Sequence, residues 1–466
     1  MAKMKLTLLI DFGSTFTKVT AMDLEAERVV ATAMSSSTVD TDVMQGLSLA
    51  VKKLKDKIGL PQLPIARKIA CSSAAGGLRM IAVGLVPSLT VEAASMAALS
   101  AGAKLVGVHA YELTASDLEE IQAKKPDVIL LAGGTDGGNR DVIIHNAKAL
   151  AQSCLQVPIV MAGNKAAREK ICGIFSGTGK DLRITANVLP AINELDIEPA
   201  RQAIRGVFID RIVHAKGIDK AAGYVDSILM PTPTAVMQAA KLLAEGTADE
   251  PGLGDIVVVD IGGATTDVYS VCSGKSDRCD VIPRGLPEPY VKRTVEGDLG
   301  VRYNILSILE AVGPDKLAAK ACLCPSYVVE KVRCWSRQTA SVPTDSDEIA
   351  LDHALAFFAT EIATARHAGR VEPYYTPLGI TYVQYGKDLT LVKTLIGTGG
   401  VLVKAECPQD MLRGALADPA DPNRLKPKEP DIYVDRTYIM YAAGLLAETD
   451  PSPALRIMKK NLKCYN

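Results

Sequence analysis

The chain has 466 residues, more than one hydrophobic core usually supports, so at least two domains are expected. Its 52 basic and 53 acidic residues leave a net charge of −1, which argues against a general nucleic-acid binder or a membrane-surface protein. Ten irregularly spaced cysteines favour reduced thiols in a cytoplasmic protein. Lys3 and Lys5 precede an apolar run, but Asp11 interrupts it and no cleavage site follows, so we expect a buried strand rather than a signal peptide.

The first motif, Leu8 to Thr20, predicts a hairpin: an apolar strand ends in Asp11, and a small-residue turn leads into a Thr-containing strand. The turn residues are Gly13, Ser14 and Thr15. Because they carry little or no side chain, backbone amides can close around phosphate oxygens. Asp11 can hold a hydrated magnesium ion that the phosphates share. Lys18 is placed to reach a phosphate as a point charge, although a solvated strand residue is the alternative.

Downstream of a strand at 28–33 and a helix at 47–58, strands alternate with helices. The strands are expected at 104–109, 128–131, 158–161 and 182–188, and the helices at 91–103, 116–124, 139–151 and 165–175. Such alternation predicts a parallel sheet in an inserted α/β segment. A Gly-rich turn at 132–138 is a second phosphate-site hypothesis, but an ordinary strand-to-helix turn is favoured. His109 and His145 are interpreted as satisfied histidines rather than metal ligands.

The second motif repeats the first position for position. An apolar strand from Val258 ends in Asp260, a small-residue turn follows, and a strand with Asp267 leads away. The turn region comprises Gly262, Gly263, Ala264 and Thr265. Before it, Pro233 to Val236 opens an apolar helix, and a hinge is expected at 250–254. Two aligned turns in one chain predict two anion cradles for one nucleotide.

After the second motif, the proline-rich stretch 283–289 is expected to be irregular, and 305–367 to be largely helical. Glu296 lies between them, where it is expected either to approach the nucleotide or a connecting loop, or to be an exposed turn carboxylate. The Cys322-x-Cys324 pair lacks the partners of a metal site and is interpreted as free thiols. A strand then enters the turn Gly397, Thr398, Gly399 and Gly400. A small-residue helix at 438–447 and a basic helix at 457–463 complete the chain.

The four motifs resemble, in order, the phosphate-1, first connecting-helix, phosphate-2 and adenosine motifs of the actin, heat-shock chaperone and sugar-kinase superfamily. The resemblance implies an α/β, two-lobed actin-like (ribonuclease H-like) fold that binds ATP or ADP with Mg²⁺ between its lobes. It implies a first lobe at 1–75 and 216–250, an insert at 76–215, and a second lobe at 251–466 with a helical insert near 300–370.

The same resemblance implies roles for the motif residues. Asp11, Asp260 and Asp267 are the implied metal ligands, with Asp267 and Asp11 acting in hydrolysis. Asp267 would orient the attacking water. The implied nucleotide-binding residues are Gly13, Ser14, Thr15, Lys18, Gly262, Gly263, Ala264, Thr265, Gly397, Thr398, Gly399 and Gly400. One position departs from the pattern: heat-shock chaperones carry Glu before the Pro-Thr of the connecting helix, where this chain has Thr232. The departure implies either slow hydrolysis or hydrolysis that is arranged differently.

Over nearly its full length, including the Val295 to Gly300 run, the chain is similar to the accessory proteins encoded with adenosylcobalamin-dependent glutamate mutase. This resemblance implies an ATP-dependent reactivating chaperone, a weak ATPase whose partners are mutase subunits and which promotes release of damaged cobalamin. Two other function classes stay open: a phosphotransferase or hydantoinase-like small-molecule enzyme, and a nucleotide-gated scaffold. Nucleic acid and membrane are not expected partners, and a homo-oligomer is compatible with the sequence.

Overall fold

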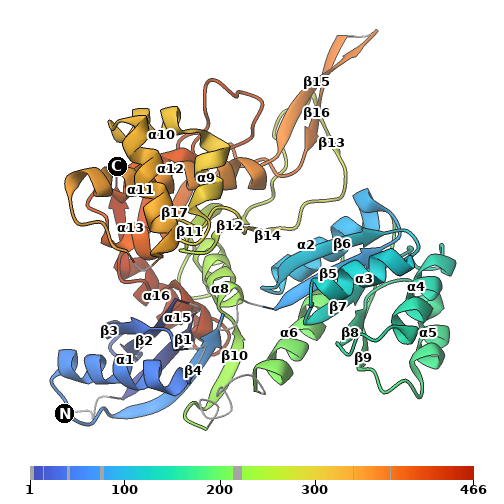
Figure 1. Ribbon diagram of the computed structural model, residues 1–466, viewed down its shortest axis with the longest axis horizontal. Helices are drawn as coiled ribbons and strands as arrows, with labels where there is room; N and C mark the ends of the chain where they lie inside the picture. The colour runs from blue at the N-terminus through green and yellow to red at the C-terminus, as the bar shows by residue number, and fades with distance from the viewer. Residues whose placement is uncertain are drawn as a thin grey trace. The chain divides into compact units, whose positions relative to one another are not determined.

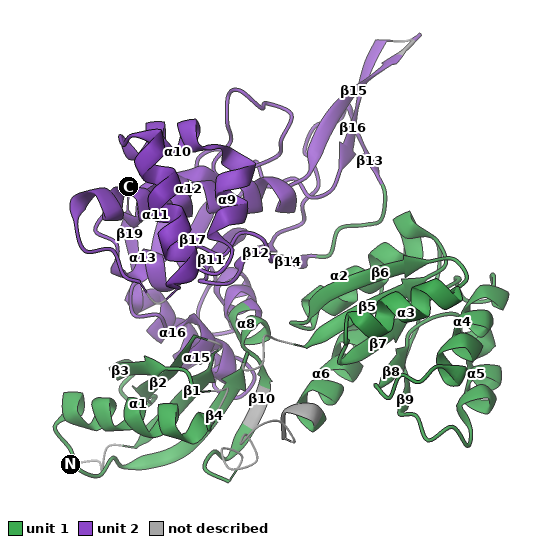
Figure 2. Ribbon diagram, viewed as in Figure 1, with its two compact units in different colours: residues 1–236, 285–289 green, residues 237–284, 290–466 purple. Residues whose placement is uncertain are grey.

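The structure is a computed structural model that describes residues 5–13, 15–38, 42–73, 78–213, 223–339, 341–377 and 379–465. The predicted turn residue Ser14 and the predicted boundaries at 75–76 and 215–216 lie outside these residues. The chain divides into two compact units (Figure 2): unit 1 is residues 1–236 and 285–289, and unit 2 is residues 237–284 and 290–466. The finer predicted domain boundaries stay a prediction.

The first sheet of unit 1 has the strand order β10-β4-β1-β2-β3 (Figure 1). Its strands are β1 (Leu6–Phe12), β2 (Phe16–Asp23), β3 (Arg28–Ser36), β4 (Ile65–Ser72) and β10 (Ser227–Pro231). β1, β4 and β10 run parallel, whereas β2 is antiparallel to β1 and to β3. Helix α1 (Val43–Ile58) begins at the N-cap Asp42 and ends at Gly59, whose φ of 75° suits a left-handed cap.

A second, fully parallel sheet of unit 1 has the order β6-β5-β7-β8-β9. Its strands are β5 (Arg79–Gly84), β6 (Lys104–Ala110), β7 (Val128–Leu131), β8 (Ile159–Met161) and β9 (Leu182–Ile184). The helical segments are η2 (Pro87–Val91), α2 (Glu92–Ser100), α3 (Ala115–Ala123), α4 (Asp141–Gln152), η3 (Lys165–Ala167), α5 (Arg168–Phe175) and α6 (Glu198–Val213). Side chains alternate along β5, so that Ile81 and Val83 join a core with α3, α4 and α5 while Met80 and Ala82 join another with α2 and α6. The sheet is therefore buried on both faces, as parallel sheets require.

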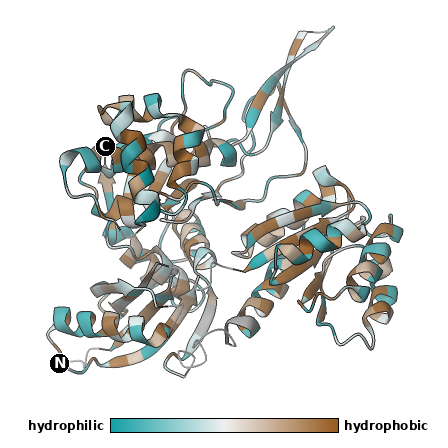
Figure 3. Cartoon of the chain, in the orientation of Figure 1, coloured by the Kyte–Doolittle hydropathy of each residue, from teal (hydrophilic) through white to brown (hydrophobic). Residues whose placement is uncertain are grey.

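Unit 2 is built on a six-stranded sheet of order β14-β12-β11-β17-β18-β19. The strands are β11 (Ile256–Ile261), β12 (Thr266–Val271), β14 (Val291–Glu296), β17 (Thr394–Thr398), β18 (Asp431–Asp435) and β19 (Leu462–Tyr465). β11, β17 and β18 run parallel, and β12 is antiparallel to β11 and β14. Hydrophobic residues of these strands share a buried core with the surrounding helices, and Figure 3 colours much of the ribbon of this unit as hydrophobic.

Helices and a small sheet complete unit 2. The helical segments are α9 (Ile305–Val312), α10 (Pro314–Ala321), α11 (Pro325–Arg337), α12 (Ser346–His367), α13 (Gly400–Lys404), α14 (Pro408–Leu412), η4 (Arg413–Ala415), α15 (Met440–Leu446) and α16 (Pro451–Asn461). The small sheet has the order β13-β16-β15, with β13 (Val281–Arg284), β15 (Arg370–Thr376) and β16 (Gly379–Tyr385). Helix α8 (Thr232–Glu245) follows β10 along the chain. None of the described helices combines the length and apolar character needed to cross a bilayer.

The two large sheets repeat one topology. Unit 1 orders its strands β3-β2-β1-β4-β10, and unit 2 orders the equivalent strands β14-β12-β11-β17-β18, with the same antiparallel second strand in each. The second sheet of unit 1 lies between β4 and β10 along the chain. The predicted α/β, two-lobed actin-like (ribonuclease H-like) fold with an inserted α/β segment is thereby confirmed.

Three local expectations were wrong or incomplete. Strand β5, which lies between β6 and β7 in the inserted sheet, was not predicted. Residues 281–284 form β13 although Pro283 lies in it, because β13 is an edge strand and an edge residue needs no ladder amide. The predicted basic helix is shorter than expected: α16 contains Lys459 and Lys460 but ends at Asn461, and Lys463 lies in the strand Leu462–Tyr465, which pairs with β18.

Candidate functional site

The first predicted turn connects β1 to β2, as expected of a hairpin. Asp11 and Lys18 are partners in its antiparallel register. The amide of Gly13 donates a 3.1 Å hydrogen bond to the carbonyl oxygen of Phe16. A Cβ at Gly13 would lie 2.5 Å from that oxygen, closer than real Cβ contacts, so the turn requires glycine. The hydrogen bond that closes the turn therefore explains why this position is glycine.

The carbonyl groups of the first turn are occupied by the chain beyond β3. The amide of Ser37 donates to the carbonyl oxygen of Thr15 at 2.9 Å, and its hydroxyl donates to that of Gly13 at 2.8 Å. Because these carbonyl oxygens already accept hydrogen bonds, the turn is better suited to an anion than to a cation. Anions are bound by backbone amide donors and not by carbonyl acceptors.

Asp11 is buried among three partners. Its Oδ2 accepts a 3.0 Å hydrogen bond from Lys18 Nζ, and its Oδ1 accepts one of 2.6 Å from the hydroxyl of Thr232 at the start of α8. Cys71 Sγ lies 3.7 Å from the same Oδ1. Burial, assisted by the negative charge of Asp11, raises the pKa of the Cys71 thiol well above its usual range. Cys71 is thus a neutral donor here, not a thiolate.

The second predicted turn repeats the first in atomic detail. Asp260 and Asp267 are register partners in the β11–β12 hairpin, as Asp11 and Lys18 are in the first. The amide of Gly262 donates to the carbonyl oxygen of Thr265 at 2.9 Å. A Cβ at Gly262 would lie 2.8 Å from that oxygen. The two motif glycines therefore have the same structural role in two hairpins.

The carbonyl oxygens of the second turn also accept hydrogen bonds from residues later in the chain. The amides of residues 301, 302 and 303 donate to the carbonyl oxygens of Gly262 and Gly263, and the side-chain amide of Asn304 donates to that of Ala264 at 2.8 Å. Gly300 makes this approach possible, since a Cβ there would lie 2.3 Å from the Ala264 carbonyl carbon. Among the residues that the structure describes, the amides of Gly263 and Ala264 donate no hydrogen bond, and both residues are partly exposed. They are available to phosphate oxygens.

Asp267 is held in a buried ion pair that the sequence did not reveal. Arg293 on β14 donates to its Oδ1 from Nε at 2.9 Å and from an Nη at 2.6 Å, and Thr265 donates to its Oδ2 at 2.9 Å. Arg293 is 6% exposed. Because a cation already lies against Asp267 and both its oxygens accept hydrogen bonds, direct coordination of Mg²⁺ by Asp267 would require Arg293 to move. The predicted roles of Asp267 stay predictions.

The predicted adenosine turn lies beside the second hairpin. β17 runs parallel to β11 with Asp260 and Thr398 as register partners. Gly399 has a φ of 109°, and a Cβ there would lie 2.3 Å from the carbonyl oxygen of Ile261. The Thr398 hydroxyl faces Asp435 at 3.4 Å, whose pKa is raised by complete burial. The structure therefore brings the second cradle and the adenosine turn together within unit 2.

Glu296 is partly buried and is therefore not an exposed turn carboxylate, and its approach to the nucleotide or a connecting loop stays a prediction. At the end of β14 it accepts a 2.6 Å hydrogen bond from Arg366 on α12, which also binds Asp298 at 2.7 Å. Burial raises the pKa of Glu296, and the hydrogen bond from Arg366 opposes that shift. The hydrogen bond between Arg366 and Glu296 connects helix α12 to the last residue of β14, the strand that pairs with β12 of the second hairpin.

The predicted site residues thus form two groups. Asp11, Gly13, Thr15 and Lys18 lie together in unit 1 and are joined by Thr232 and Cys71, which sequence reasoning did not assign to the site. Asp260, Asp267, residues 262–265 and residues 397–400 lie together in unit 2 and are joined by Arg293. Thr232 was detectable as the residue that precedes Pro233. Cys71 and Arg293 carry no motif and are recognised only through their contacts.

Among solved structures, the chain is similar to gluconate kinase from Lactobacillus acidophilus, with 10% identity and a TM-score of 0.36 over 100% of this chain and 93% of that one. It is also similar to xylulose kinase from Bifidobacterium adolescentis, with 11% identity and a TM-score of 0.30 over 99% of this chain and 96% of that one. At these TM-scores the likeness carries no weight, and the fold assignment rests on the repeated strand order.

The sequence relationship is much closer. The family model described as MutL protein matches residues 7–462. A curated protein of Clostridium tetanomorphum, named Protein MutL, is 50% identical over 457 residues, which are 98% of this chain and 98% of that protein. On both grounds, the chain belongs to the MutL protein family.

Proposed function

We propose that this protein is an ATP-dependent reactivating chaperone for an adenosylcobalamin-dependent mutase of the glutamate mutase type. The observation that carries the proposal is the repeated hairpin: two turns in one chain share the same glycine, the same closing hydrogen bond and the same preceding aspartate. Membership of the MutL family and the resemblance to mutase accessory proteins support a mutase as the client. When the adenosylcobalamin of a radical enzyme loses its adenosyl group, an inactive cobalamin stays bound, and a partner is needed to release it.

The residues present fit a nucleotide with Mg²⁺. Amides of Gly263 and Ala264 are available for phosphate oxygens, and Lys18 supplies a positive charge at the first turn. Both oxygens of Asp11 already accept hydrogen bonds, so Asp11 would hold Mg²⁺ through the ion's water shell, as Mg²⁺ commonly permits. Asp260 would do the same from the second hairpin. Bound Mg²⁺ would neutralise phosphate charge.

The protein's own residues would convert nucleotide binding into a change of conformation. The first cradle belongs to unit 1, and the second cradle with the adenosine turn belongs to unit 2. A nucleotide can shift the equilibrium between two arrangements of the units only by its different contacts in each. If both cradles bind the same nucleotide, ATP and ADP will favour different arrangements, and the affinity for the mutase will change with them.

Hydrolysis is expected to be slow. Thr232 occupies the position where heat-shock chaperones carry Glu, and it donates to Asp11 rather than accepting a proton from water. Asp267 is engaged by Arg293. We therefore expect turnover below about 1 per second, the lower end of the range typical of kinases. A slow ATPase suits a protein whose bound state must last long enough to act on a client.

The test is restoration of an inactivated glutamate mutase by the purified protein with ATP, Mg²⁺ and fresh adenosylcobalamin. Recovery of mutase activity that requires ATP, and that fails with the G262A variant, supports the proposal. Recovery that is equal without ATP, or no recovery at all, contradicts it. A matched G173A variant controls for the substitution, because Gly173 lies on α5 and a Cβ there meets nothing within 4 Å.

A parallel screen separates the other function classes. ADP production that depends on an added small-molecule acceptor would indicate a phosphotransferase or a hydantoinase-like enzyme. Tight ATP binding without ADP production, with or without the mutase, would indicate a nucleotide-gated scaffold.

A further inference from the structure

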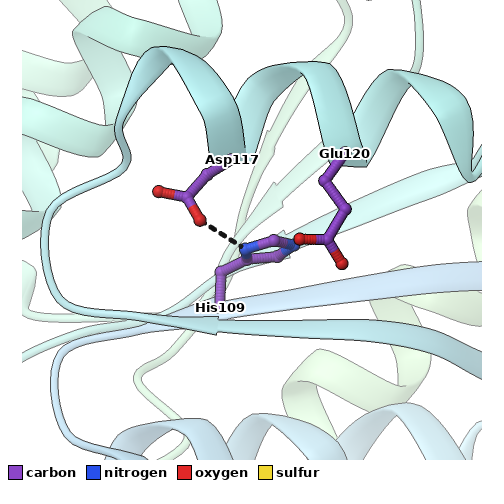
Figure 4. Close-up of side chains that lie close together, drawn as sticks. All are labelled: His109, Asp117 and Glu120. Carbon is purple, nitrogen blue, oxygen red and sulfur yellow. Dashed lines mark hydrogen bonds and ion pairs between the residues drawn. The ribbon is translucent and has the colours of Figure 1, made fainter.

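A histidine in the second sheet of unit 1 lies between two carboxylates that the proposed function does not use (Figure 4). His109 is on β6, the edge strand of that sheet, and Asp117 and Glu120 lie one turn apart on α3. One ligand atom from each of the three residues lies within 4.8 Å of the others. The spacing is that of groups able to share a metal ion.

The position of Asp117 is fixed by the start of α3. Thr114 and Asp117 form a capping box, in which Oδ2 of Asp117 accepts hydrogen bonds from the Thr114 amide at 2.8 Å and hydroxyl at 2.6 Å. The hydrogen bond from the Thr114 hydroxyl is the main reason why the pKa of Asp117 is lowered. The other oxygen, Oδ1, lies 3.2 Å from Nδ1 of His109. Because Asp117 accepts hydrogen bonds from Thr114, we assign it the acceptor role toward His109 as well, so that Nδ1 is the donor and, in the neutral ring, Nε2 carries the lone pair.

Nε2 of His109 has no partner in the described part of the chain. It is buried without a hydrogen bond, and the side chain is only 6% exposed. Figure 4 shows this nitrogen on the side of the ring that faces the Glu120 carboxylate. In the neutral tautomer with the hydrogen on Nδ1, Nε2 and the carboxylate are both acceptors, so neither can satisfy the other. A cation between them would satisfy both.

We propose that Nε2 of His109 and the carboxylate of Glu120 bind a divalent ion of the zinc class, with water in the remaining positions. An imidazole nitrogen with a carboxylate oxygen suits Zn²⁺ and its neighbours, whereas Mg²⁺ and Ca²⁺ prefer oxygen alone. Asp117 is a positioning residue, because a carboxylate on the second ring nitrogen is the usual partner that orients a metal-binding histidine. None of these three residues belongs to either predicted phosphate-binding turn.

Lys124 is the competing partner of Glu120. Its Nζ lies 2.5 Å from Oε1, in a pair whose side chains are 34% and 53% exposed. Solvent-exposed pairs of this kind contribute little to stability, so a metal ion can displace Lys124 or bind the second oxygen. Glu120 also provides the way in, since the exposed carboxylate can swing away from Nε2 and let the ion reach it.

The test is metal binding by the full-length protein, stripped with a chelator, kept reduced and free of nucleotide. Zn²⁺ retained after gel filtration is counted by mass spectrometry, and Co²⁺ titration reports the ligands by visible absorption. We expect the wild type to bind one more equivalent than E120Q and H109A, with a Co²⁺ spectrum of nitrogen and oxygen ligands that lacks sulfur charge-transfer bands. D117N should keep the stoichiometry and lose about 10- to 100-fold in affinity.

The matched control is E119Q, which removes an exposed carboxylate from the same helix next to the site. It should bind like the wild type. Equal stoichiometry and affinity in wild type, E119Q, E120Q and H109A would overturn the proposal, as would a cobalt spectrum dominated by thiolate. If H109A is unfolded by circular dichroism, E120Q decides alone, because its side chain is exposed and the substitution leaves the core intact.

Discussion

The hydroxyl of Thr232 donates a 2.6 Å hydrogen bond to Oδ1 of Asp11, a residue 221 positions earlier in the chain. This contact ties the first residue of α8 to the end of β1, where the first turn begins. Residue 232 departs from the heat-shock chaperone pattern and contacts the aspartate proposed to hold the ion. The departure therefore alters the site itself and not a remote helix cap.

The first prediction concerns this contact. T232V removes the donor but keeps the volume of the side chain, so Asp11 loses the partner that orients it. We expect the affinity for ATP in the presence of Mg²⁺ to fall by about 10-fold, the low end of the effect of outer-shell partners at metal sites. Calorimetric titration with and without Mg²⁺ measures this. T232S keeps the hydroxyl and should bind like the wild type, and an equal loss in T232S would contradict the assigned role.

The second prediction concerns the closing hydrogen bond of the second turn. G262A places a Cβ at 2.8 Å from the Thr265 carbonyl oxygen, so the turn must open. We expect a loss of about 1–3 kcal/mol in the free energy of unfolding, the usual cost of overpacking. G173A should instead stabilise α5 by about 0.5–1 kcal/mol, since alanine is the better helix former. Denaturant unfolding compares the two, and a stable G262A would show that the turn tolerates a side chain.

The third prediction concerns the buried ion pair. R293M leaves the Asp267 carboxylate buried without its cation, a change that typically costs about 3–5 kcal/mol. The double variant R293M/D267L should recover most of that stability, because replacing both charges by apolar groups is often neutral. Urea unfolding of the wild type, R293M, D267L and the double variant gives the coupling energy between the two side chains. If the double variant R293M/D267L is no more stable than R293M, the stability lost in R293M does not come from the unpaired Asp267 carboxylate.

The fourth prediction concerns pH. His367 ends α12, with Nε2 at 2.8 Å from the Ser270 hydroxyl and Nδ1 at 2.8 Å from that of Thr294. Complete burial holds its pKa well below the ordinary value of 6.5. The unfolded chain gains this proton below about pH 6.5 and the folded chain does not, so stability is present above that pH and is lost as the pH falls.

Below pH 6.5, His367 should lower the free energy of unfolding by up to about 1.4 kcal/mol for each pH unit, until the pH reaches its pKa in the folded state. Urea unfolding at pH values from about 7.5 to about 5, a range that brackets the ordinary pKa of histidine, measures this loss of stability. H367Q, which does not titrate, should lack this component of the slope. An unchanged slope in H367Q would assign the acid sensitivity to other groups.

The sequence was sufficient for features that depend on local chemistry. Both hairpins were predictable, since an aspartate followed by a glycine turn and a Thr-containing strand fixes the geometry over few residues. The parallel sheet was predictable from alternation of strands and helices, and the region 305–367 from its helical pattern. Trp335, the one tryptophan of the chain, lies in this helical region and is buried in the core of unit 2.

The missed features depend on contacts between distant segments. Strand β5 is short and uncharged after Arg79, so its pattern does not distinguish it from a helix, and only pairing with β6 and β7 defines it. The hairpin of β15 and β16 contains Pro373, which argues against a strand until its edge position is known. Arg293 reaches Asp267 across strands, and no spacing rule connects them. The unpartnered nitrogen of His109 is likewise visible only in three dimensions.

The central claim is that the two cradles bind one nucleotide together. The most direct test is the stoichiometry of ATP binding with Mg²⁺ in wild type, G13A and G262A, measured by calorimetry, with G173A as control. We predict one ATP per chain in wild type and G173A, and loss of that single site in either G13A or G262A, although the two glycines belong to different units. Two independent sites, or a site that survives one of the substitutions unchanged, would contradict the account.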